Sequence, residues 1–214
     1  METPHRPITV LAVDDHPIVR EGIAALLEHQ PDMVLIAEAE NAREAIDAFR
    51  VHRPDVTLMD LQMPGASGIE AIVTIRREFP RARIAVLTTY RGDAQAARAL
   101  EAGAAGYLLK SAVRKELLET IRAIHAGYKR IPADVALDIA EHHTADPLTP
   151  REIEILRHVA GGGGNKIVAD ALGISLETVK GHMKNVLAKL EARDRTHAVT
   201  VALKRGILDD TSAI

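Results

Sequence analysis

Five short apolar runs alternate with helical patterns along residues 8–126, and this alternation constrains the fold more than any other feature. The runs are rich in Val, Ile and Leu, as buried parallel strands are, and apolar residues recur at helical spacing between them. The strand-like runs are ITVLAV, MVLIAEA, VTLMD, RIAVLT and GYLLK, and the helical patterns cover residues 18–27, 42–49, 69–79, 94–102 and 114–126. Because right-handed crossovers place helices on both faces, the sequence predicts an α/β doubly wound parallel sheet of five strands.

Charged and hydroxyl side chains fall where these predicted strands end. They are Asp14 and Asp15 after the first strand, Asp60 at the end of the third, Thr88 at the end of the fourth and Lys110 at the end of the fifth. In a doubly wound sheet of strand order 2-1-3-4-5 these ends lie side by side, so the five side chains are expected to converge. Singly, each has a plain alternative role, such as a helix-capping aspartate, a strand threonine or a surface lysine. Their joint position favours a functional site.

Three carboxylates that meet without partners repel one another and raise one another's pKa values. A hard divalent cation relieves this, and Mg²⁺ held by one or two carboxylates, waters and phosphate oxygens fits better than a site built wholly of protein atoms. A carboxylate, Mg²⁺, a hydroxyl and a lysine are the groups that phosphoryl transfer onto an aspartate needs. The sequence therefore predicts that Asp60 attacks phosphorus, that Lys110 and the cation neutralise the phosphoryl oxygens, and that Thr88 binds one of them.

Four motifs in this part of the chain, VDDHPIVREGI, MDLQMPGASGIEA, AVLTTY and GAAGYLLK, resemble the receiver domain of two-component response regulators in order and spacing. The resemblance covers residues 6–126 and implies the flavodoxin-like, CheY-like form of the fold, with a receiver domain over residues 1–126. It also implies that Asp60 accepts phosphate from a sensor histidine kinase. Ser111 is a departure, since many receivers have proline there, but others with the same kind of carboxyl-terminal domain do not.

The resemblance also implies which residues hold the metal. Asp15, Asp60 and the backbone carbonyl of Gln62 would bind Mg²⁺ directly, and Asp14 would act through a water molecule. All four residues are therefore expected at one Mg²⁺ site.

A second set of implied residues would contact the phosphate and report its presence. Thr88, Thr89 and Lys110 are expected at the phosphate. Thr88 and Tyr107 match the family's switch pair, in which the hydroxyl swings to the phosphate and the aromatic ring turns inward. Without the resemblance, the simplest interpretation of Tyr107 is a partly exposed strand aromatic.

The pattern loosens over residues 127–146, which we interpret as a linker holding a short helix, and becomes wholly helical over residues 147–214. Thr149 and Glu152 form a capping box at the start of the first helix. Further helices are expected over residues 165–172, 175–190 and 196–205. Two helices joined by a short turn that contains glycine form a helix-turn-helix, whose second helix enters the major groove of DNA.

This segment resembles the four-helix DNA-binding domain of the regulators named for NarL, LuxR and FixJ, through LTPREIEIL, NKIVADALGIS, TVKGHMKNVLAKL and RTHAV. The resemblance implies that the chain binds double-stranded DNA as a homodimer on activation. The implied DNA-binding residues are Lys166, Ser175, Thr178, Lys180, Gly181, His182 and Lys184, and the implied dimerisation residues are Ala198, Val199, Ala202 and Leu203.

Each of these assignments has a plainer alternative. A pair such as Lys180 and Lys184 is usually just a solvated helix face, His182 could cap or pack, and the stripe over residues 198–203 could close the domain's own core. Gly181 departs from the family, because it offers no side chain to a base and costs the helix about 1 kcal/mol relative to alanine. Fewer side-chain contacts to bases are therefore expected here.

Four consecutive glycines, residues 161–164, precede Asn165 and Lys166. A phosphate-wrapping P-loop would need a hydroxyl residue after the lysine and a strand before the glycines, whereas here Ile167 follows the lysine and a helical pattern precedes the loop. The glycines are instead expected to join the first two helices of the carboxyl-terminal domain. We expect them to give that loop large backbone freedom until DNA binding orders it.

Composition limits the class of protein. The absence of cysteine excludes disulfides, thiolate zinc sites and a cysteine nucleophile, and no apolar run is long enough to span a membrane, so we expect a cytoplasmic protein with no membrane partner. Residues 1–146 carry 17 Lys and Arg against 22 Asp and Glu, and residues 147–214 carry 10 against 8. The net charges of -5 and +2 suit a polyanion partner for the second part, although an ordinary solvated surface explains them equally well.

These expectations combine into a phosphorylation-controlled transcription regulator that is not a classical enzyme. One alternative is a phosphohydrolase with Asp60 as nucleophile, but such enzymes need an aspartate two residues further on, where this chain has Gln62. A second alternative is a regulator whose output helices bind protein or RNA.

Overall fold

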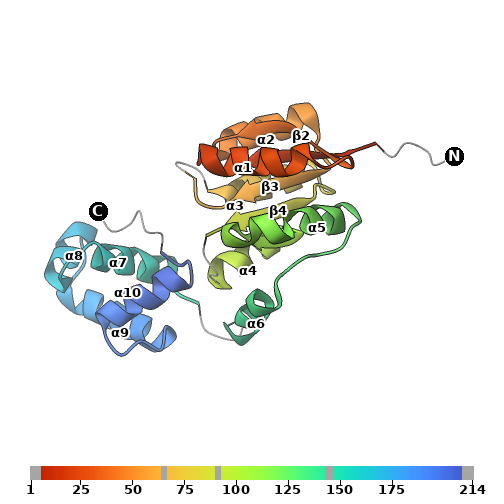
Figure 1. Cartoon of the computed structure of the whole chain (residues 1–214). Helices are drawn as coiled ribbons and strands as arrows, with labels where there is room; N and C mark the ends of the chain where they lie inside the picture. The colour runs from red at the N-terminus through yellow and green to blue at the C-terminus, as the bar shows by residue number, and fades with distance from the viewer. Residues whose placement is uncertain (1–5, 64–66, 90–92, 143–146, 209–214) are drawn as a thin grey trace. The chain divides into compact units, whose positions relative to one another are not determined.

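The computed structural model describes residues 6–63, 67–89, 93–142 and 147–208, and it contains a parallel sheet with flanking helices and a separate helical unit (Figure 1). The strands are β1 (Ile8–Val13), β2 (Met33–Ala39), β3 (Val56–Asp60), β4 (Ile84–Thr88) and β5 (Gly106–Leu109). The helices are α1 (Pro17–Glu28), α2 (Ala42–His52), α3 (Gly68–Glu78), α4 (Asp93–Glu101), α5 (Val113–His125), α6 (Ala133–His142), α7 (Pro150–Ala160), α8 (Asn165–Leu172), α9 (Leu176–Lys189) and α10 (Arg195–Lys204), with a 3₁₀ turn at Lys110–Ala112. The chain divides into two compact units, residues 1–89 with 96–133 and residues 134–214 with 90–95.

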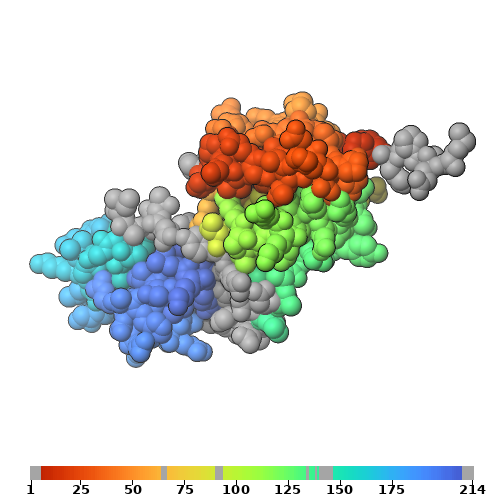
Figure 2. Space-filling model, viewed as in Figure 1, coloured from red at the N-terminus to blue at the C-terminus, as the bar shows by residue number. Residues whose placement is uncertain are grey.

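The sheet has the strand order β2-β1-β3-β4-β5 and every pairing is parallel, which confirms the doubly wound fold. Helices α1 and α5 cover one face and α2 and α3 the other (Figure 1). Every residue of β3 and β4 is buried, because both faces of these central strands lie under helices. On the α1 and α5 side, Ile23 and Ile121 join strand residues such as Leu58 in one apolar cluster. In the space-filling view, α1 (red) and the green helices α4 and α5 make up much of this unit's visible surface (Figure 2).

The carboxyl ends of the strands are aligned by their register. Asp60 lies opposite Leu87 in the β3–β4 pair, and Thr88 lies opposite Leu109 in the β4–β5 pair. The chain then leaves the sheet along the same edge, so the residues that follow each strand gather there. This alignment is what positions the candidate site.

The residues that follow α5 extend the sheet beyond β5. Arg130 forms a parallel bridge with Gly106, its amide donates to the Ala105 carbonyl at 3.0 Å, and its carbonyl accepts from the Tyr107 amide at 2.8 Å. Part of the segment that the sequence suggests as a linker therefore pairs with the edge strand of the sheet.

The second unit packs α7, α8, α9 and α10 around its own apolar cluster, in which Ile155, Val168, Val179 and Val186 are almost fully buried. Thr149 and Glu152 form the predicted capping box at the start of α7. Helix α8 ends at Gly173, whose φ of 62° is the left-handed conformation that glycine adopts readily. A short turn then leads to α9, as a helix-turn-helix requires.

None of the described helices is both long enough and apolar enough to cross a lipid bilayer.

Candidate functional site

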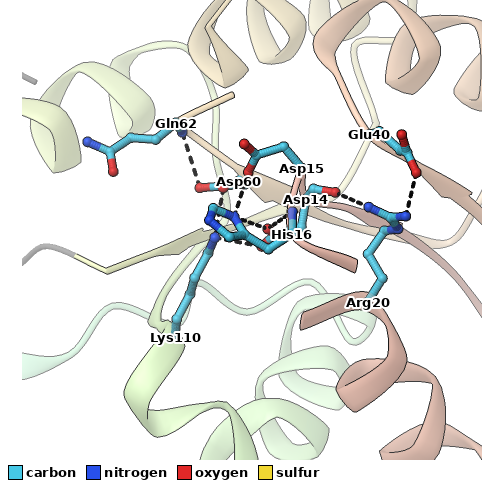
Figure 3. A network of polar contacts seen from close by, with 8 residues as sticks. All are labelled: Asp14, Asp15, His16, Arg20, Glu40, Asp60, Gln62 and Lys110. Atoms are coloured by element: carbon cyan, nitrogen blue, oxygen red, sulfur yellow. Dashed lines mark hydrogen bonds and ion pairs between the residues drawn. The ribbon is translucent and has the colours of Figure 1, made fainter. Parts of the chain in front are cut away.

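Carboxylates and a lysine meet at the carboxyl edge of the sheet (Figure 3). Lys110, directly after β5, places its Nζ 2.7 Å from Asp14 Oδ2 and 2.8 Å from Asp60 Oδ2. Asp14 and Asp15 follow β1, and Asp60 is the last residue of β3. The convergence predicted from the strand ends is therefore present for these four side chains.

Burial makes this cluster electrostatically unusual. Asp14 and Asp60 are 0% and 1% exposed. Burial raises the pKa of Asp60 above its ordinary value and the charge of Asp14 adds to this effect, whereas Lys110 and the Gln62 amide oppose it. For Lys110, burial works against the charged form, but hydrogen bonds to Asp14 and Asp60 raise its pKa above the ordinary value. The single ammonium group of Lys110 is thus the close positive partner of both buried carboxylates.

The loop after β3 is held close to Asp60. The Gln62 amide donates to Asp60 Oδ1 at 3.1 Å, while the Gln62 side chain points away from the carboxylate (Figure 3). At Gly68, the first residue of α3, an added Cβ would lie 1.9 Å from the Asp60 carbonyl oxygen. Only glycine allows α3 to begin so close to the end of β3, so Gly68 is a structural requirement of the site that the motif alone does not explain.

The predicted phosphate-contact and switch residues occupy two different environments. Thr88 is fully buried at the end of β4, and Thr89, the next residue, is exposed. Tyr107 in β5 is only 1% exposed, so the interpretation as a partly exposed strand aromatic does not describe this structure. The ring already lies inward.

Two residues beside the cluster are not assigned by sequence reasoning. Arg20 in α1 is almost buried, and its Nη1 donates to the Asp14 carbonyl at 2.7 Å while its other nitrogens bind Glu38 and Glu40. A charged residue within the apolar pattern of α1 is the sequence signal that could have identified it. His16 places Nδ1 3.2 Å from an Asp14 carboxylate oxygen and 2.7 Å from one of Asp15, and no sequence signal predicts that orientation.

The donor set fits a hard divalent cation. Asp14, Asp15, His16 and Asp60 each offer one ligand atom, and these atoms lie within 4.8 Å of one another. Asp15 Oδ1 is buried and makes no hydrogen bond with the residues that the structure describes, although His16 Nδ1 lies 2.7 Å away. Carboxylate oxygens with unfilled coordination are the ligands that Mg²⁺ selects. Asp14 Oδ1 accepts the His16 amide at 3.0 Å, but His16 is itself the N-cap residue of α1 and no side-chain hydrogen bond caps that helix, so the capping alternative does not account for Asp14.

The predicted DNA-contact residues lie mostly on exposed surface of the second unit. Lys180, Gly181 and Lys184 are exposed on α9, opposite the buried Val179, Met183 and Val186, and Lys166 is exposed on α8. His182 is only half-buried. Ser175 caps α9 by accepting the Thr178 amide at 3.0 Å, and both residues are exposed. Lys180 pairs with Glu177 at 2.7 Å, so this lysine is not an isolated charge.

The four predicted dimerisation residues of α10 differ in burial. Ala198 and Ala202 are fully buried in the unit's own core, and Val199 and Leu203 are half-buried at its border. The alternative that this stripe closes the domain core thus accounts for the two alanines.

The glycine loop differs from the expected free loop. The amides of Gly161, Gly162 and Gly163 donate to carbonyls of the last turns of α7, and Gly162 has a φ of 82°. The bonds from Gly162 to Val159 and from Gly163 to His158 form the Schellman pattern that ends many helices. Arg195 of α10 also donates to the Gly163 carbonyl at 2.7 Å. The glycines here terminate a helix, a role that the motif comparison does not predict.

Both units match known protein families. The response regulator receiver domain matches residues 10–122, and the luxR family of bacterial regulatory proteins matches residues 146–202. The transcriptional regulatory protein LiaR of Bacillus subtilis is 40% identical over 210 residues, which cover 94% of this chain and 100% of LiaR. The response regulator protein VraR of Staphylococcus aureus is 35% identical over 206 residues, covering 94% and 99%.

Solved structures agree with these matches. A two-component response regulator of the LuxR family from Aurantimonas sp. is 44% identical, with a TM-score of 0.61, and covers 64% of this chain and 99% of its own. RcsB from Salmonella enterica, bound to a promoter in the presence of the phosphomimetic BeF₃⁻, is 28% identical with a TM-score of 0.70 and covers 92% and 98%. Both resemblances drawn from the motifs are therefore confirmed.

Proposed function

This chain belongs to the response regulators with a LuxR-type DNA-binding domain, and from that premise we propose that a phosphoryl group on Asp60 controls its binding to DNA. One observation carries the assignment to Asp60. This carboxylate is buried at the end of β3, 2.8 Å from Lys110, in a cluster of four potential ligands. A nucleophilic aspartate in phosphoryl transfer needs these neighbours.

In the proposed step, a carboxylate oxygen of Asp60 forms a bond to phosphorus while the bond from phosphorus to the donor nitrogen of a phosphohistidine breaks. The donor imidazole leaves with the electron pair of that bond. Lys110 holds Asp60 in place and offsets the negative charge that gathers on the phosphoryl oxygens. The Thr88 hydroxyl, at the end of the neighbouring strand β4, would bind one of those oxygens. Thr89 and Tyr107 complete the proposed phosphate-contact and switch residues.

We assign the metal site to Asp14, Asp15, Asp60 and the backbone carbonyl of Gln62. Mg²⁺ bound there would supply charge neutralisation for the phosphoryl group. The residues themselves explain why a cation is needed, since Lys110 balances only part of the carboxylate charge.

Gln62 argues against the phosphohydrolase alternative. An aspartate-nucleophile hydrolase uses a carboxyl group two residues after the nucleophile as acid and base, and Gln62 has an amide there that cannot transfer a proton in that way. The proposed site therefore keeps its phosphoryl group long enough to act as a signal, with at most self-phosphorylation and self-dephosphorylation.

The output is proposed to be double-stranded DNA contacted by α9. Lys180 and Lys184 are exposed on one face, as a recognition helix requires, and Gly181 adds no side chain to the exposed surface of α9. Lys180 must leave Glu177 to reach a base, so part of its binding energy goes into breaking that exposed pair. Lys166, Ser175, Thr178 and His182 are proposed as contacts to the phosphate backbone.

The remaining partners follow from the same proposal. A sensor histidine kinase would supply the phosphoryl group in the cytoplasm, where the protein would meet its DNA. Phosphorylation would shift an existing equilibrium towards a homodimer, with Val199 and Leu203 as the members of the α10 stripe that remain accessible.

Labelling with a small phosphodonor tests the Asp60 assignment. In Mg²⁺, acetyl phosphate should label the wild-type chain, and Asp60→Asn should abolish the label while Asp47→Asn, an exposed aspartate of α2, keeps it. Peptide mass spectrometry after reduction of the acyl phosphate locates the label. A label that persists in Asp60→Asn would remove Asp60 from this role.

A DNA-binding titration tests the output. Lys180→Ala and Lys184→Ala should weaken operator binding by roughly 1 to 3 kcal/mol if the lysines reach bases, with loss of discrimination against random duplex. Log affinity should fall steeply with log salt concentration, as phosphate contacts require. Binding that is insensitive to salt, or a preference for RNA or protein, would favour the alternative output.

A further inference from the structure

His16 is the first residue after the paired aspartates, and its ring is turned towards the carboxylate cluster (Figure 3). Its Nδ1 is 2.7 Å from Asp15 Oδ1 and 3.2 Å from Asp14 Oδ1. The same imidazole supplies one of the four ligand atoms that lie within 4.8 Å of one another. It is the one nitrogen donor in that group.

The backbone around His16 is fixed. Its amide donates to Asp14 Oδ1 at 3.0 Å, and Arg20 holds the Asp14 carbonyl at 2.7 Å while pairing with Glu38 and Glu40. His16 is also the N-cap residue of α1, directly before Pro17, whose ring fixes φ. The start of α1 thus carries the imidazole to the edge of the cluster.

The approach of His16 to Asp15 is close but does not form a hydrogen bond. Asp15 Oδ1, the oxygen nearest the imidazole, is buried and without a hydrogen bond among the described residues. A carboxylate oxygen and an imidazole nitrogen that face each other in this way are a donor pair that a cation can share. Carboxylate oxygens suit Mg²⁺, Ca²⁺ and Mn²⁺, whereas an imidazole adds affinity for first-row transition metals, least for Mn²⁺ and more for Ni²⁺ and Zn²⁺.

We propose that His16 is a metal-selectivity residue, whose imidazole joins the carboxylates in holding the cation and shifts the preference of the site from Mg²⁺ towards Mn²⁺ and later first-row metals. The inference rests on the proposed cation site of the phosphoacceptor, and it adds a ligand that the oxygen donors do not supply. It makes the metal that loads the site depend on residue 16.

Pulsed electron paramagnetic resonance of Mn²⁺ bound to the full chain tests this directly, because a coordinated imidazole nitrogen modulates the electron spin echo. The wild-type chain should show this nitrogen modulation, and His16→Asn should lose it. His29→Asn is the matched control, since His29 lies at the other end of α1 with its ring against the Ala25 carbonyl. Labelling the histidines with ¹⁵N should change the modulation in the wild-type chain and in the control.

Calorimetric titrations with Mn²⁺ and with Mg²⁺ give a second readout. In His16→Asn the ratio of Mn²⁺ to Mg²⁺ affinity should fall about tenfold, whereas the Mg²⁺ affinity should change less than about twofold. Absence of nitrogen modulation in the wild-type chain, or an unchanged affinity ratio in His16→Asn, would overturn the proposal. Far-ultraviolet circular dichroism of each variant shows that it is folded.

The phosphodonor experiment keeps this inference separate from the proposed function. If Asp60 is labelled in Mg²⁺ but no nitrogen modulation is seen, only the role of His16 fails. If Asp60 is not labelled, the phosphoacceptor assignment fails, and the Mn²⁺ spectra still decide whether the imidazole is a ligand.

Discussion

Each unit of this protein buries a lysine against carboxylate groups, and the two arrangements have opposite electrostatic outcomes. In the receiver, Lys110 contacts both Asp14 and Asp60, and the pKa of Asp60 is raised, chiefly by burial. In the DNA-binding unit, Lys189 contacts Glu152 at 3.0 Å, and the pKa of Glu152 is lowered. Both lysine side chains are similarly buried, at 12% and 15% exposure.

The number of partners explains the difference. Burial works against ionisation of Glu152, but the Thr149 amide and hydroxyl and the Lys189 ammonium group more than offset it. Among the residues that the structure describes, one cation faces one anion there, and Lys189 also donates to the Pro147 carbonyl. At the receiver edge one ammonium group faces several carboxylates, so negative charge is left unbalanced. The matched pair stabilises a fold, whereas the unmatched cluster can bind a cation and a phosphoryl group.

The largest expected effect comes from breaking the matched pair. Glu152→Ala leaves Lys189 with less compensation and removes the capping box, so the free energy of unfolding of the second unit should fall by about 3 kcal/mol. Hydrogen exchange of α7 and α9 amides in the full chain, followed by mass spectrometry, measures this locally. Glu154→Ala, on the same helix with a partly exposed partner, should cost about 1 kcal/mol or less. Equal costs for the two variants would mean that Glu152 is no more than a surface ion pair.

Removing a carboxylate from the unmatched cluster of the receiver should raise the free energy of unfolding, the opposite of the effect expected for Glu152→Ala. Asp60→Asn removes a buried carboxylate whose ionised form is disfavoured, while Lys110 keeps Asp14 as a partner. In buffer without divalent cations the receiver should therefore gain on the order of 1 to 2 kcal/mol of unfolding free energy. Added Mg²⁺ should stabilise the wild-type chain more than the variant, because binding to the native state adds to stability. A loss of stability in Asp60→Asn without cations would show that the cluster is balanced after all.

Lowering the pH should change the contributions of Glu152 and Asp60 to stability in opposite directions. The folded pKa of Glu152 lies below the ordinary value of 4.5, so its stabilising contribution is present above that pH and is lost as the pH falls through the folded pKa. The folded pKa of Asp60 lies above 3.8, so its ionised form lowers stability above the folded pKa, and this penalty is relieved as the pH falls towards 3.8.

Two differences in unfolding free energy, wild type minus Glu152→Gln and wild type minus Asp60→Asn, isolate these contributions. As the pH is lowered through the acid range, the first should decrease and the second should increase. Chemical denaturation at a series of pH values provides the measurement. Parallel pH profiles for the two differences would contradict the proposed contrast.

The receiver site could be predicted from sequence because strand ends in a parallel sheet have a fixed geometry. The apolar runs gave the strands, and the strand order brought Asp14, Asp60 and Lys110 together without knowledge of any contact. The roles of Arg20 and His16 could not be derived in this way. Their contacts depend on where α1 begins and on side-chain directions, which periodicity does not specify.

The helical unit was predictable where a local pattern sets the structure, as in the capping box of Thr149 and Glu152. The partner of Glu152 was not, since Lys189 lies 37 residues away and only tertiary packing joins them. The pairing of Arg130 with β5 was missed for a similar reason. A single residue at a sheet edge gives no alternating pattern, and its bridge is visible only once the strands are placed.

The smallest expected effect concerns the glycine loop. Three of its amides are hydrogen-bonded within the second unit, as the Glu152 carboxylate is. Gly162 has a φ of 82°, so Gly162→Ala forces a side chain into the left-handed region and should cost about 1 kcal/mol. At Gly163 an added Cβ would lie 2.8 Å from the His158 carbonyl oxygen, which should weaken the helix end by a similar amount. At Gly164 the position is open and φ is −67°, so Gly164→Ala is the control for backbone strain. Alanine is a poorer N-cap of α8 than glycine but reduces the freedom of the unfolded chain, so the net change should stay within about 0.5 kcal/mol.

Hydrogen exchange with and without DNA then decides how the loop is used. Three loop amides are already hydrogen-bonded, so they should be protected in the free chain and gain little from DNA. Under that outcome Gly162→Ala should lower the stability of the unit and weaken DNA binding only to the extent that the unit unfolds. If the loop amides instead exchange freely and become protected only on DNA, DNA binding orders the four-glycine loop. In that case the loop amides of the second unit are not stably hydrogen-bonded before DNA binds.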